Sequence, residues 1–211
     1  MDRKPLLIGF LVAVFLTGKP TIAASCATIN VAPNVSICLK NGWQPILGGK
    51  LTTLDAFGSG GKLLDFTKLS FAANLYGTDN AVAAMLNIRR YPSETITQAD
   101  VLSFTTTSDE AYKSVSELDL ALQEVIKTEL PKRGIKILGW LGTVLNRLDG
   151  KTVFTTTYRR LSAATKTVFV VSLVRYFNGP ESFTLTLSHR ESLGAGILTE
   201  MNEVQDSVRI Y

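Results

Sequence analysis

The stretch at residues 135–162, IKILGWLGTVLNRLDGKTVFTTTYRRLS, decides the fold. Asp149–Gly150 separates two runs rich in β-branched and aromatic residues, and an Asp-Gly pair in this position is the strongest short signal for a two-residue hairpin turn. Such a turn fixes which residues face each other across the two strands. The predicted pairs are Leu148 with Lys151, Leu145 with Phe154, Leu141 with Tyr158, and Trp140 with Arg159.

This register predicts one apolar face and one candidate contact. Leu141, Leu145, Phe154 and Tyr158 share a face and are expected to be buried together. Trp140 and Arg159 form the candidate partner-binding pair, because aromatic and arginine side chains dominate binding hot spots. An aromatic–guanidinium contact contributes roughly 0.5–2 kcal/mol. The alternative is ordinary packing of this pair in a sheet beneath a helix.

The hairpin opens a meander that continues to residue 191. Residues 167–177 are apolar at both odd and even positions, which predicts a central strand covered on both sides. Residues 183–190 alternate between apolar and polar side chains, as a half-buried strand does. Upstream, residues 68–76 and 81–91 are strand-like and are joined by the turn composition Gly-Thr-Asp-Asn.

Helical periodicity appears in three places. A short helix is expected at residues 97–104. A long helix follows, with Thr107 as N-cap, Glu110 completing a capping box and Pro131 ending it. The last helix places Ile197, Met201, Val204 and Val208 on one side. The predicted fold class is α+β, a central antiparallel sheet of about six strands flanked by helices.

The beginning of the chain predicts export. Residues 1–24 combine a charged start, a short apolar run and small residues before Ser25, as a secretory signal peptide does. An uncleaved anchor is the alternative. Residues 25–66 are expected to be an N-terminal extension and loop, and residues 67–211 the α+β domain. The expected location is the periplasm or the extracellular space.

Cys26 and Cys38 are the two cysteines of the 211-residue chain. Export to an oxidising compartment favours a disulfide between them. The alternative is lipidation of Cys26, which would make the protein a peripheral, membrane-anchored lipoprotein. Ala23 stands where a lipobox normally carries a large aliphatic residue. The two interpretations exclude each other at Cys26.

Charge and composition argue against several function classes. Removing residues 1–24 deletes three basic residues and one acidic residue, so the formal charge falls from +4 to +2, too little for long-range attraction to nucleic acid. The glycine-rich segment at residues 56–66 has Ala56 and Leu63 where a phosphate-binding loop needs Gly and Ser or Thr. His189, the only histidine, lacks a serine on its own strand face. No catalytic residue, metal site or cofactor is predicted.

The order of these elements resembles a known superfamily. Gly42–Trp43 precedes two strands and a long helix, the meander turns on Asp149–Gly150, and the strand SFTLTLSHR leads into a closing helix. This order is similar to that of the PsbP/DcrB-like superfamily over about residues 41–211. The extended loop at residues 44–66 departs from the compact members.

The resemblance implies an antiparallel sheet flanked by helices and a non-catalytic role. Members include extrinsic subunits of the photosynthetic oxygen-evolving complex, bacterial envelope proteins and secretion-linked chaperones. No family-wide catalytic motif exists, so no residue is carried over as functional. The leader is of the bacterial secretory type, which argues against the photosynthetic role.

The leading hypothesis is therefore an exported, non-enzymatic domain that binds an envelope or secreted protein, as an adaptor or assembly factor. One alternative is a periplasmic carrier of a small molecule or lipid, with a pocket of a few hundred Å³ between the sheet and the helix at residues 107–130. The other is an immunity protein that neutralises a periplasmic toxin. An enzyme of another type would need convergent polar residues with perturbed pKa values in a cleft.

Overall fold

The structure is a computed structural model and describes residues 26–47, 68–103, 109–162 and 165–211, with only the backbone at 109–114. The predicted signal peptide, most of the loop at residues 44–66 and the capping residue Thr107 lie outside the described residues.

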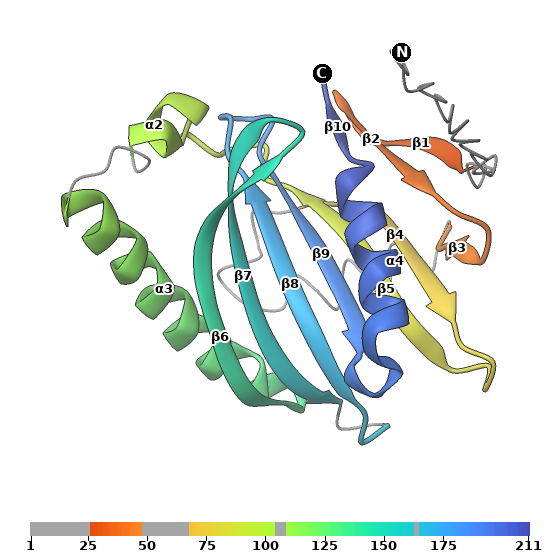
Figure 1. Cartoon of the computed structure of the whole chain (residues 1–211). Coiled ribbons are helices and arrows are strands. Elements are labelled where there is room, and N and C mark those ends of the chain that lie inside the picture. The colour runs from red at the N-terminus through yellow and green to blue at the C-terminus, as the bar shows by residue number, and fades with distance from the viewer. Residues whose placement is uncertain (1–25, 48–67, 104–108, 163–164) are drawn as a thin grey trace, which may run out of the picture.

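The main element is a seven-stranded antiparallel sheet with the order β3-β4-β5-β9-β8-β7-β6 (Figure 1). The predicted α+β class is confirmed, and the sheet is larger than the six strands expected. The two-sided apolar strand is interior, between two neighbours, as predicted. The strands are β3 (Trp43–Pro45), β4 (Lys68–Tyr76), β5 (Val82–Arg90), β6 (Ile135–Leu148), β7 (Lys151–Ser162), β8 (Val168–Tyr176) and β9 (Phe183–Arg190).

A second, three-stranded sheet joins the two ends of the described chain. Its order is β1 (Ala27–Ala32), β2 (Val35–Leu39) and β10 (Arg209–Ile210). Val31, Val35, Ile37 and Leu39 are buried with the main sheet in one core cluster, which also contains Trp43. The N-terminal segment is thus part of the core, and sequence analysis did not predict its strands.

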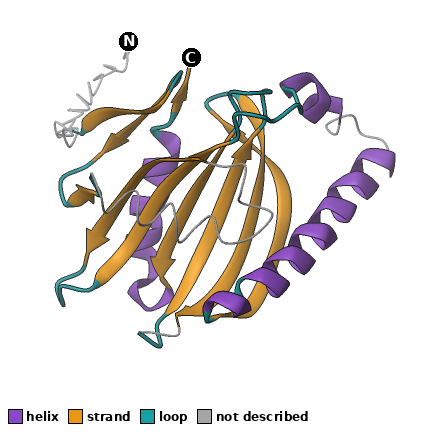
Figure 2. Ribbon diagram, turned by 180° about the vertical axis from the view of Figure 1, so that it is seen from behind, coloured by secondary structure: helices purple, strands orange, loops and turns teal. Residues whose placement is uncertain are grey.

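The described helices are α2 (Gln98–Ser103), α3 (Asp109–Glu129) and α4 (Gly194–Asp206), with single 3₁₀ turns at Pro131–Arg133 and Glu191–Leu193. Helices α3 and α4 lie on opposite faces of the main sheet, and the short helix α2 lies at one end of it (Figure 1 and Figure 2). Helix α4 buries Ile197, Met201 and Val204 in the large core cluster, as the sequence predicts. Helix α3 contributes Ile126 to a smaller cluster with Tyr158, Phe169 and Val171.

The predicted hairpin register is correct near the turn and wrong beyond it. Leu148 pairs with Lys151 and Leu145 with Phe154. Two register shifts in β6, next to Gly139 and Gly142, then change the pairing, so that Trp140 faces Tyr158. Gly142 has a φ of +101°, which suits a bulge that inserts an extra residue.

The shifts turn Leu141 away from the core. Its side chain is 60% exposed, whereas Phe154 and Tyr158 are buried. The expected common face of Leu141, Leu145, Phe154 and Tyr158 is therefore wrong at Leu141, because each bulge residue reverses the alternation of the strand.

Candidate functional site

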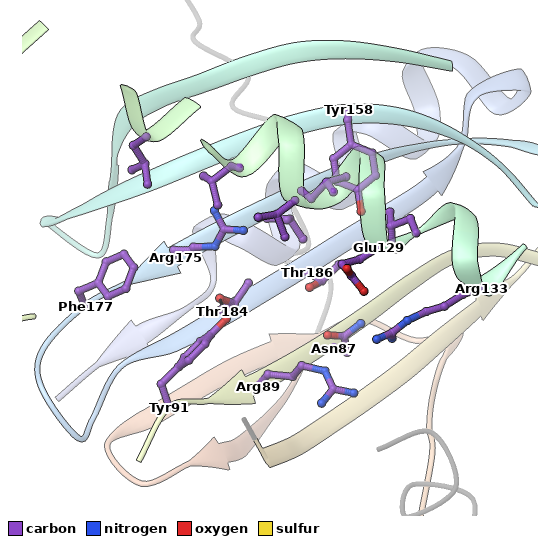
Figure 3. Close-up of a pocket in the computed structure, with 16 residues that line it drawn as sticks. Asn87, Arg89, Tyr91, Glu129, Arg133, Tyr158, Arg175, Phe177, Thr184 and Thr186 are labelled. Atoms are coloured by element: carbon purple, nitrogen blue, oxygen red, sulfur yellow. Dashed lines mark hydrogen bonds between the residues drawn. The ribbon is translucent and has the colours of Figure 1, made fainter. Parts of the chain in front are cut away.

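A pocket of about 380 Å³ lies between α3 and the sheet face opposite α4 (Figure 3). Its volume is within the range of pockets that hold small ligands, roughly 300–1,000 Å³. The lining residues come from β5, the segment after β5, β7, β8, β9 and α3. They are Asn87, Arg89, Tyr91, Leu118, Leu122, Val125, Ile126, Glu129, Leu130, Arg133, Tyr158, Leu173, Arg175, Phe177, Thr184 and Thr186.

The roof of the pocket is the apolar side of α3. Leu118, Leu122 and Val125 recur at helical spacing and face the pocket, yet all three are only half-buried. Ile126, one helical turn after Leu122, is buried against the sheet. An amphipathic helix normally presses its apolar stripe onto the core, so this half-buried stripe leaves apolar surface for another molecule to cover.

The floor of the pocket is polar. In the row of directly paired residues across β5, β9 and β8, Arg89 faces Thr184 and Thr184 faces Arg175. Residues paired in this way point to the same face of a sheet. The Tyr91 hydroxyl lies 2.8 Å from the Thr184 hydroxyl and holds the middle of the row.

The next row holds Asn87, Thr186 and Leu173. The Asn87 side-chain oxygen is buried and has no hydrogen-bond partner among the described residues. An unpaired buried polar atom costs about 1–3 kcal/mol. This oxygen is an acceptor next to the pocket for a donor group of a ligand.

Arg175 is the most unusual side chain of the floor. Its Nη1 donates to Thr156 Oγ1 at 3.3 Å, and it forms no ion pair with any described carboxylate. Burial lowers the pKa of the Arg175 guanidinium, and the Tyr91 and Tyr158 phenols oppose this effect. Burial likewise raises the pKa of the Tyr158 phenol. Tyr158 is buried and Arg175 is half-buried, so water reaches these two groups only in part.

Trp140 fixes the position of α3 over the pocket. Its ring stacks on Tyr158, with centroids 6.1 Å apart, and its Nε1 donates to Asp119 Oδ1 of α3 at 2.9 Å. Trp140 and Arg159, the predicted partner-binding pair, are not brought together. Arg159 faces Gly139 and lies on the other side of the sheet, where it forms a 2.6 Å ion pair with Glu191.

His189, which sequence analysis considered for catalysis, does not line the pocket. It lies on β9 between Ala84 and Val170, on the side of the sheet that α4 covers. Burial lowers its pKa, and the nearby Glu191 carboxylate opposes this. Within the described ranges, no cluster of three or more His, Cys, Asp or Glu side chains could hold a metal ion.

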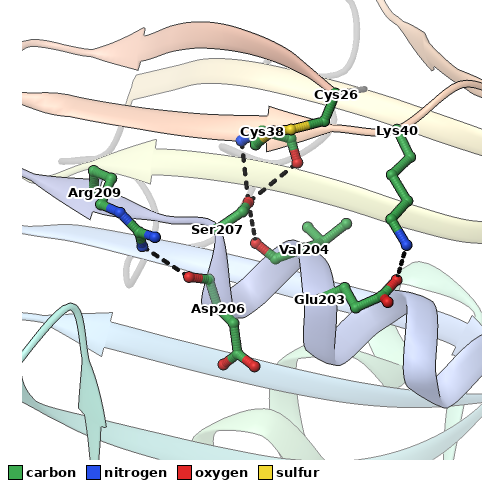
Figure 4. Close-up of a disulfide and its surroundings, with 8 residues drawn as sticks. All are labelled: Cys26, Cys38, Lys40, Glu203, Val204, Asp206, Ser207 and Arg209. Atoms are coloured by element: carbon green, nitrogen blue, oxygen red, sulfur yellow. Dashed lines mark hydrogen bonds and ion pairs between the residues drawn. A yellow bond between two sulfur atoms is a disulfide. The ribbon is translucent and has the colours of Figure 1, made fainter. Parts of the chain in front are cut away.

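Cys26 and Cys38 form the expected disulfide, with their Cα atoms 5.5 Å apart (Figure 4). Ser207, just after α4, clamps the same strand: its hydroxyl accepts from the Cys38 amide at 3.0 Å and donates to the Cys38 carbonyl at 3.1 Å. Lys40 adds an ion pair to Glu203 of α4. These contacts connect the N-terminal strands to the closing helix.

Sequence reasoning missed the charged floor of the pocket. Neither Arg89 nor Arg175 was singled out as a binding residue. The signal for Arg175 was present, because it is the one charged residue in an otherwise apolar interior strand. The pocket itself lies where the carrier hypothesis places it, between the sheet and the long helix.

Comparison with solved structures identifies the fold. The solution structure of the cyanobacterial PsbP protein CyanoP from Synechocystis sp. PCC 6803 matches with a TM-score of 0.53 and 14% identity, over 92% of this chain and 96% of that one. The chain has the PsbP/DcrB-like fold. This confirms the resemblance seen in the order of the sequence elements.

Another match among solved structures is LpqN of Mycobacterium tuberculosis, a protein involved in cell envelope biogenesis. It matches with a TM-score of 0.42 and 11% identity, over 92% of this chain and 87% of that one. No family model matches the chain, and no curated protein matches it. Among the described helices, none has both the length and the hydropathy needed to span a membrane.

Proposed function

We propose that the chain is an exported, non-enzymatic binding protein of the bacterial envelope that holds a small apolar or amphipathic molecule beneath α3. The observation that carries this proposal is the half-buried stripe of Leu118, Leu122 and Val125 above a pocket of about 380 Å³. Filling the pocket would bury this stripe and gain about 25 cal/mol for each Å² of apolar surface removed from water.

Export is supported by the leader-like residues 1–24 and by the disulfide, which persists in oxidising compartments. A disulfide at Cys26 leaves no thiol for a lipid, so the proposal is a soluble periplasmic or secreted form. A non-enzymatic role is supported by the position of His189, the only histidine, on the sheet face opposite the pocket.

Binding of an apolar probe tests the proposal. We expect the mature protein to bind N-phenyl-1-naphthylamine, a neutral dye that fluoresces in apolar surroundings. Leu122→Trp fills the pocket from its roof and should abolish the signal. Leu120→Trp is the matched control, because Leu120 is 61% exposed on another side of α3 and does not line the pocket.

Two results would reject this function. One is a wild-type protein, folded by circular dichroism, that does not bind the dye. The other is equal dye binding by wild type, Leu122→Trp and Leu120→Trp, because binding would then occur outside the pocket.

A protein-binding adaptor is the second candidate, and the edge of the sheet favours it. Strand β6 ends the seven-stranded sheet and carries Leu138, Leu141 and Val144, all exposed. An extended segment of a partner would pair with such an edge, with pockets for its alternate side chains. A photo-crosslinker at Leu141 should then capture one stoichiometric envelope protein, and the same group at Leu120 should not. The immunity-protein hypothesis has no such feature among the described residues to support it.

A further inference from the structure

The row Arg89–Thr184–Arg175 places two guanidinium groups on one side of the sheet, within the pocket. Arg89 and Arg175 are separated by a single strand, so their backbones lie about 10 Å apart. Thr184 between them is buried, and its hydroxyl is already engaged with Tyr91. Within this row, the Arg175 guanidinium is therefore the candidate binding group.

The acidic side chain that lines the pocket, Glu129, does not lie beside Arg175 (Figure 3). Glu129, the one carboxylate among the lining residues, accepts from Lys132 at 2.6 Å. It extends from the end of α3 near Arg133, whereas Arg175 and Phe177 lie at the other end of the pocket (Figure 3). The Arg175 end thus lacks a carboxylate from the described chain.

An unneutralised cation in poorly hydrated surroundings is costly, and proteins usually place an opposite charge beside it. The Arg175 guanidinium donates to Thr156 and is also hydrogen-bonded to the Tyr91 phenol. A guanidinium has five N–H donors, so further donors are available to a ligand. A planar guanidinium matches the two oxygens of a carboxylate or phosphate better than any other side chain does. An anion from outside the chain would supply the opposite charge that Arg175 does not receive from the described carboxylates.

We propose that the ligand is a single-chain amphiphile whose anionic head, a carboxylate or a phosphate, binds Arg175 while its hydrocarbon tail lies under Leu118, Leu122 and Val125. This inference rests on the proposed function, because it names the chemical class held by the same pocket. The polar floor of the pocket then contacts the anionic head of this molecule, and the apolar roof contacts its hydrocarbon tail.

Calorimetric titration of the mature, disulfide-bonded protein with three eight-carbon probes tests the inference. Octanoate and octyl phosphate carry the two candidate heads, and octanol has the same tail without a charge. At about pH 8 both anions are ionised, and we expect at least one of them to bind about 10–100-fold more tightly than octanol. The tighter anion identifies the head group. Added salt should weaken anion binding and leave octanol unchanged.

Arg175→Met keeps an unbranched apolar stem similar to that of arginine and removes the charged guanidinium. It should reduce anion binding to the level of octanol without changing octanol itself. Arg147→Met is the matched control, because Arg147 is exposed on β6 and does not line the pocket. It should behave as wild type. If Arg175→Met fails to fold, the comparison of anions, octanol and salt on wild type still decides the question.

The possible failures are distinguishable. Equal affinities of all three probes for wild type would overturn the anionic head and leave the apolar-ligand function standing. Tight anion binding that Arg175→Met does not weaken would overturn the assignment to Arg175. If none of the three probes binds, the inference is overturned, and the dye titration then decides separately whether the apolar-ligand function stands.

Discussion

Trp140 and Tyr158 stack across the β6–β7 pair with their rings 11° from parallel, and the same tryptophan hydrogen-bonds to Asp119 of α3. One side chain thus connects the edge strand, its neighbour and the helix above them. Tyr158 also lines the pocket. The hydrogen bond from Trp140 to Asp119 therefore holds α3 at a set distance from the sheet beside the pocket.

Trp140→Phe tests that contact. The change keeps an aromatic ring on Tyr158 and removes the indole N–H, so Asp119 loses its donor. We expect the free energy of unfolding to fall by about 0.5–1.5 kcal/mol in urea titrations. Asp119→Asn is the control, because its amide oxygen still accepts from the indole and should largely preserve stability. Equal stability of Trp140→Phe and wild type would show that the bond does not hold α3.

The N-terminal strands are predicted to be essential to the core. Ile37 of β2 is fully buried, so Ile37→Ala should lower the free energy of unfolding by about 2–5 kcal/mol. Leu141→Ala makes a matched deletion at an exposed bulge and should change it by less than about 0.5 kcal/mol. Similar losses at both positions would contradict the observed packing of residues 26–45.

His189 should make stability depend on pH. Its folded-state pKa is lowered from 6.5 by burial, so the unfolded chain takes up the proton first as the pH falls. Stability should therefore be fully present above about pH 6.5 and decline below it, before the carboxylates begin to titrate. His189→Asn should flatten the decline between about pH 7.5 and about pH 5.5 in urea midpoints. A slope unchanged by this substitution would assign the effect to other groups.

Reduction of the Cys26–Cys38 disulfide should destabilise the chain. The bridge closes a loop with a sequence separation of 12, for which the chain-entropy model gives roughly 3 kcal/mol. Guanidinium titrations with and without dithiothreitol measure the difference, and the double variant Cys26→Ser with Cys38→Ser should match the reduced wild type. A mature protein whose unfolding midpoint is insensitive to dithiothreitol would contradict a stabilising bridge.

Local signals in the sequence predicted much of the sheet. Asp149–Gly150 determines a turn by its own backbone preferences, and the apolar run at residues 168–177 is a property of one segment, so both were predictable. The bulges around Gly139 and Gly142 were not predictable, because the turn residues fix the register only next to the turn and do not show where one strand inserts an extra residue. The error at Trp140 and Arg159 follows from these bulges.

The N-terminal strands and the pocket were harder to predict, because both depend on contacts between segments that are distant in the sequence. Strand β2 pairs with β10 at the other end of the chain, and its buried residues acquire their surroundings only when α4 docks. Arg175 becomes a candidate binding residue only because α3 stands off the sheet above it. Sequence periodicity identifies an apolar helix face, but does not say whether protein or a ligand covers it.

Native mass spectrometry of the protein purified from the envelope tests the central claim most directly. We predict that wild type and Leu120→Trp carry an additional mass that organic extraction releases, and that Leu122→Trp has the mass of the polypeptide alone. A wild-type protein with the bare polypeptide mass, or an additional mass retained by Leu122→Trp, would contradict a ligand site beneath α3.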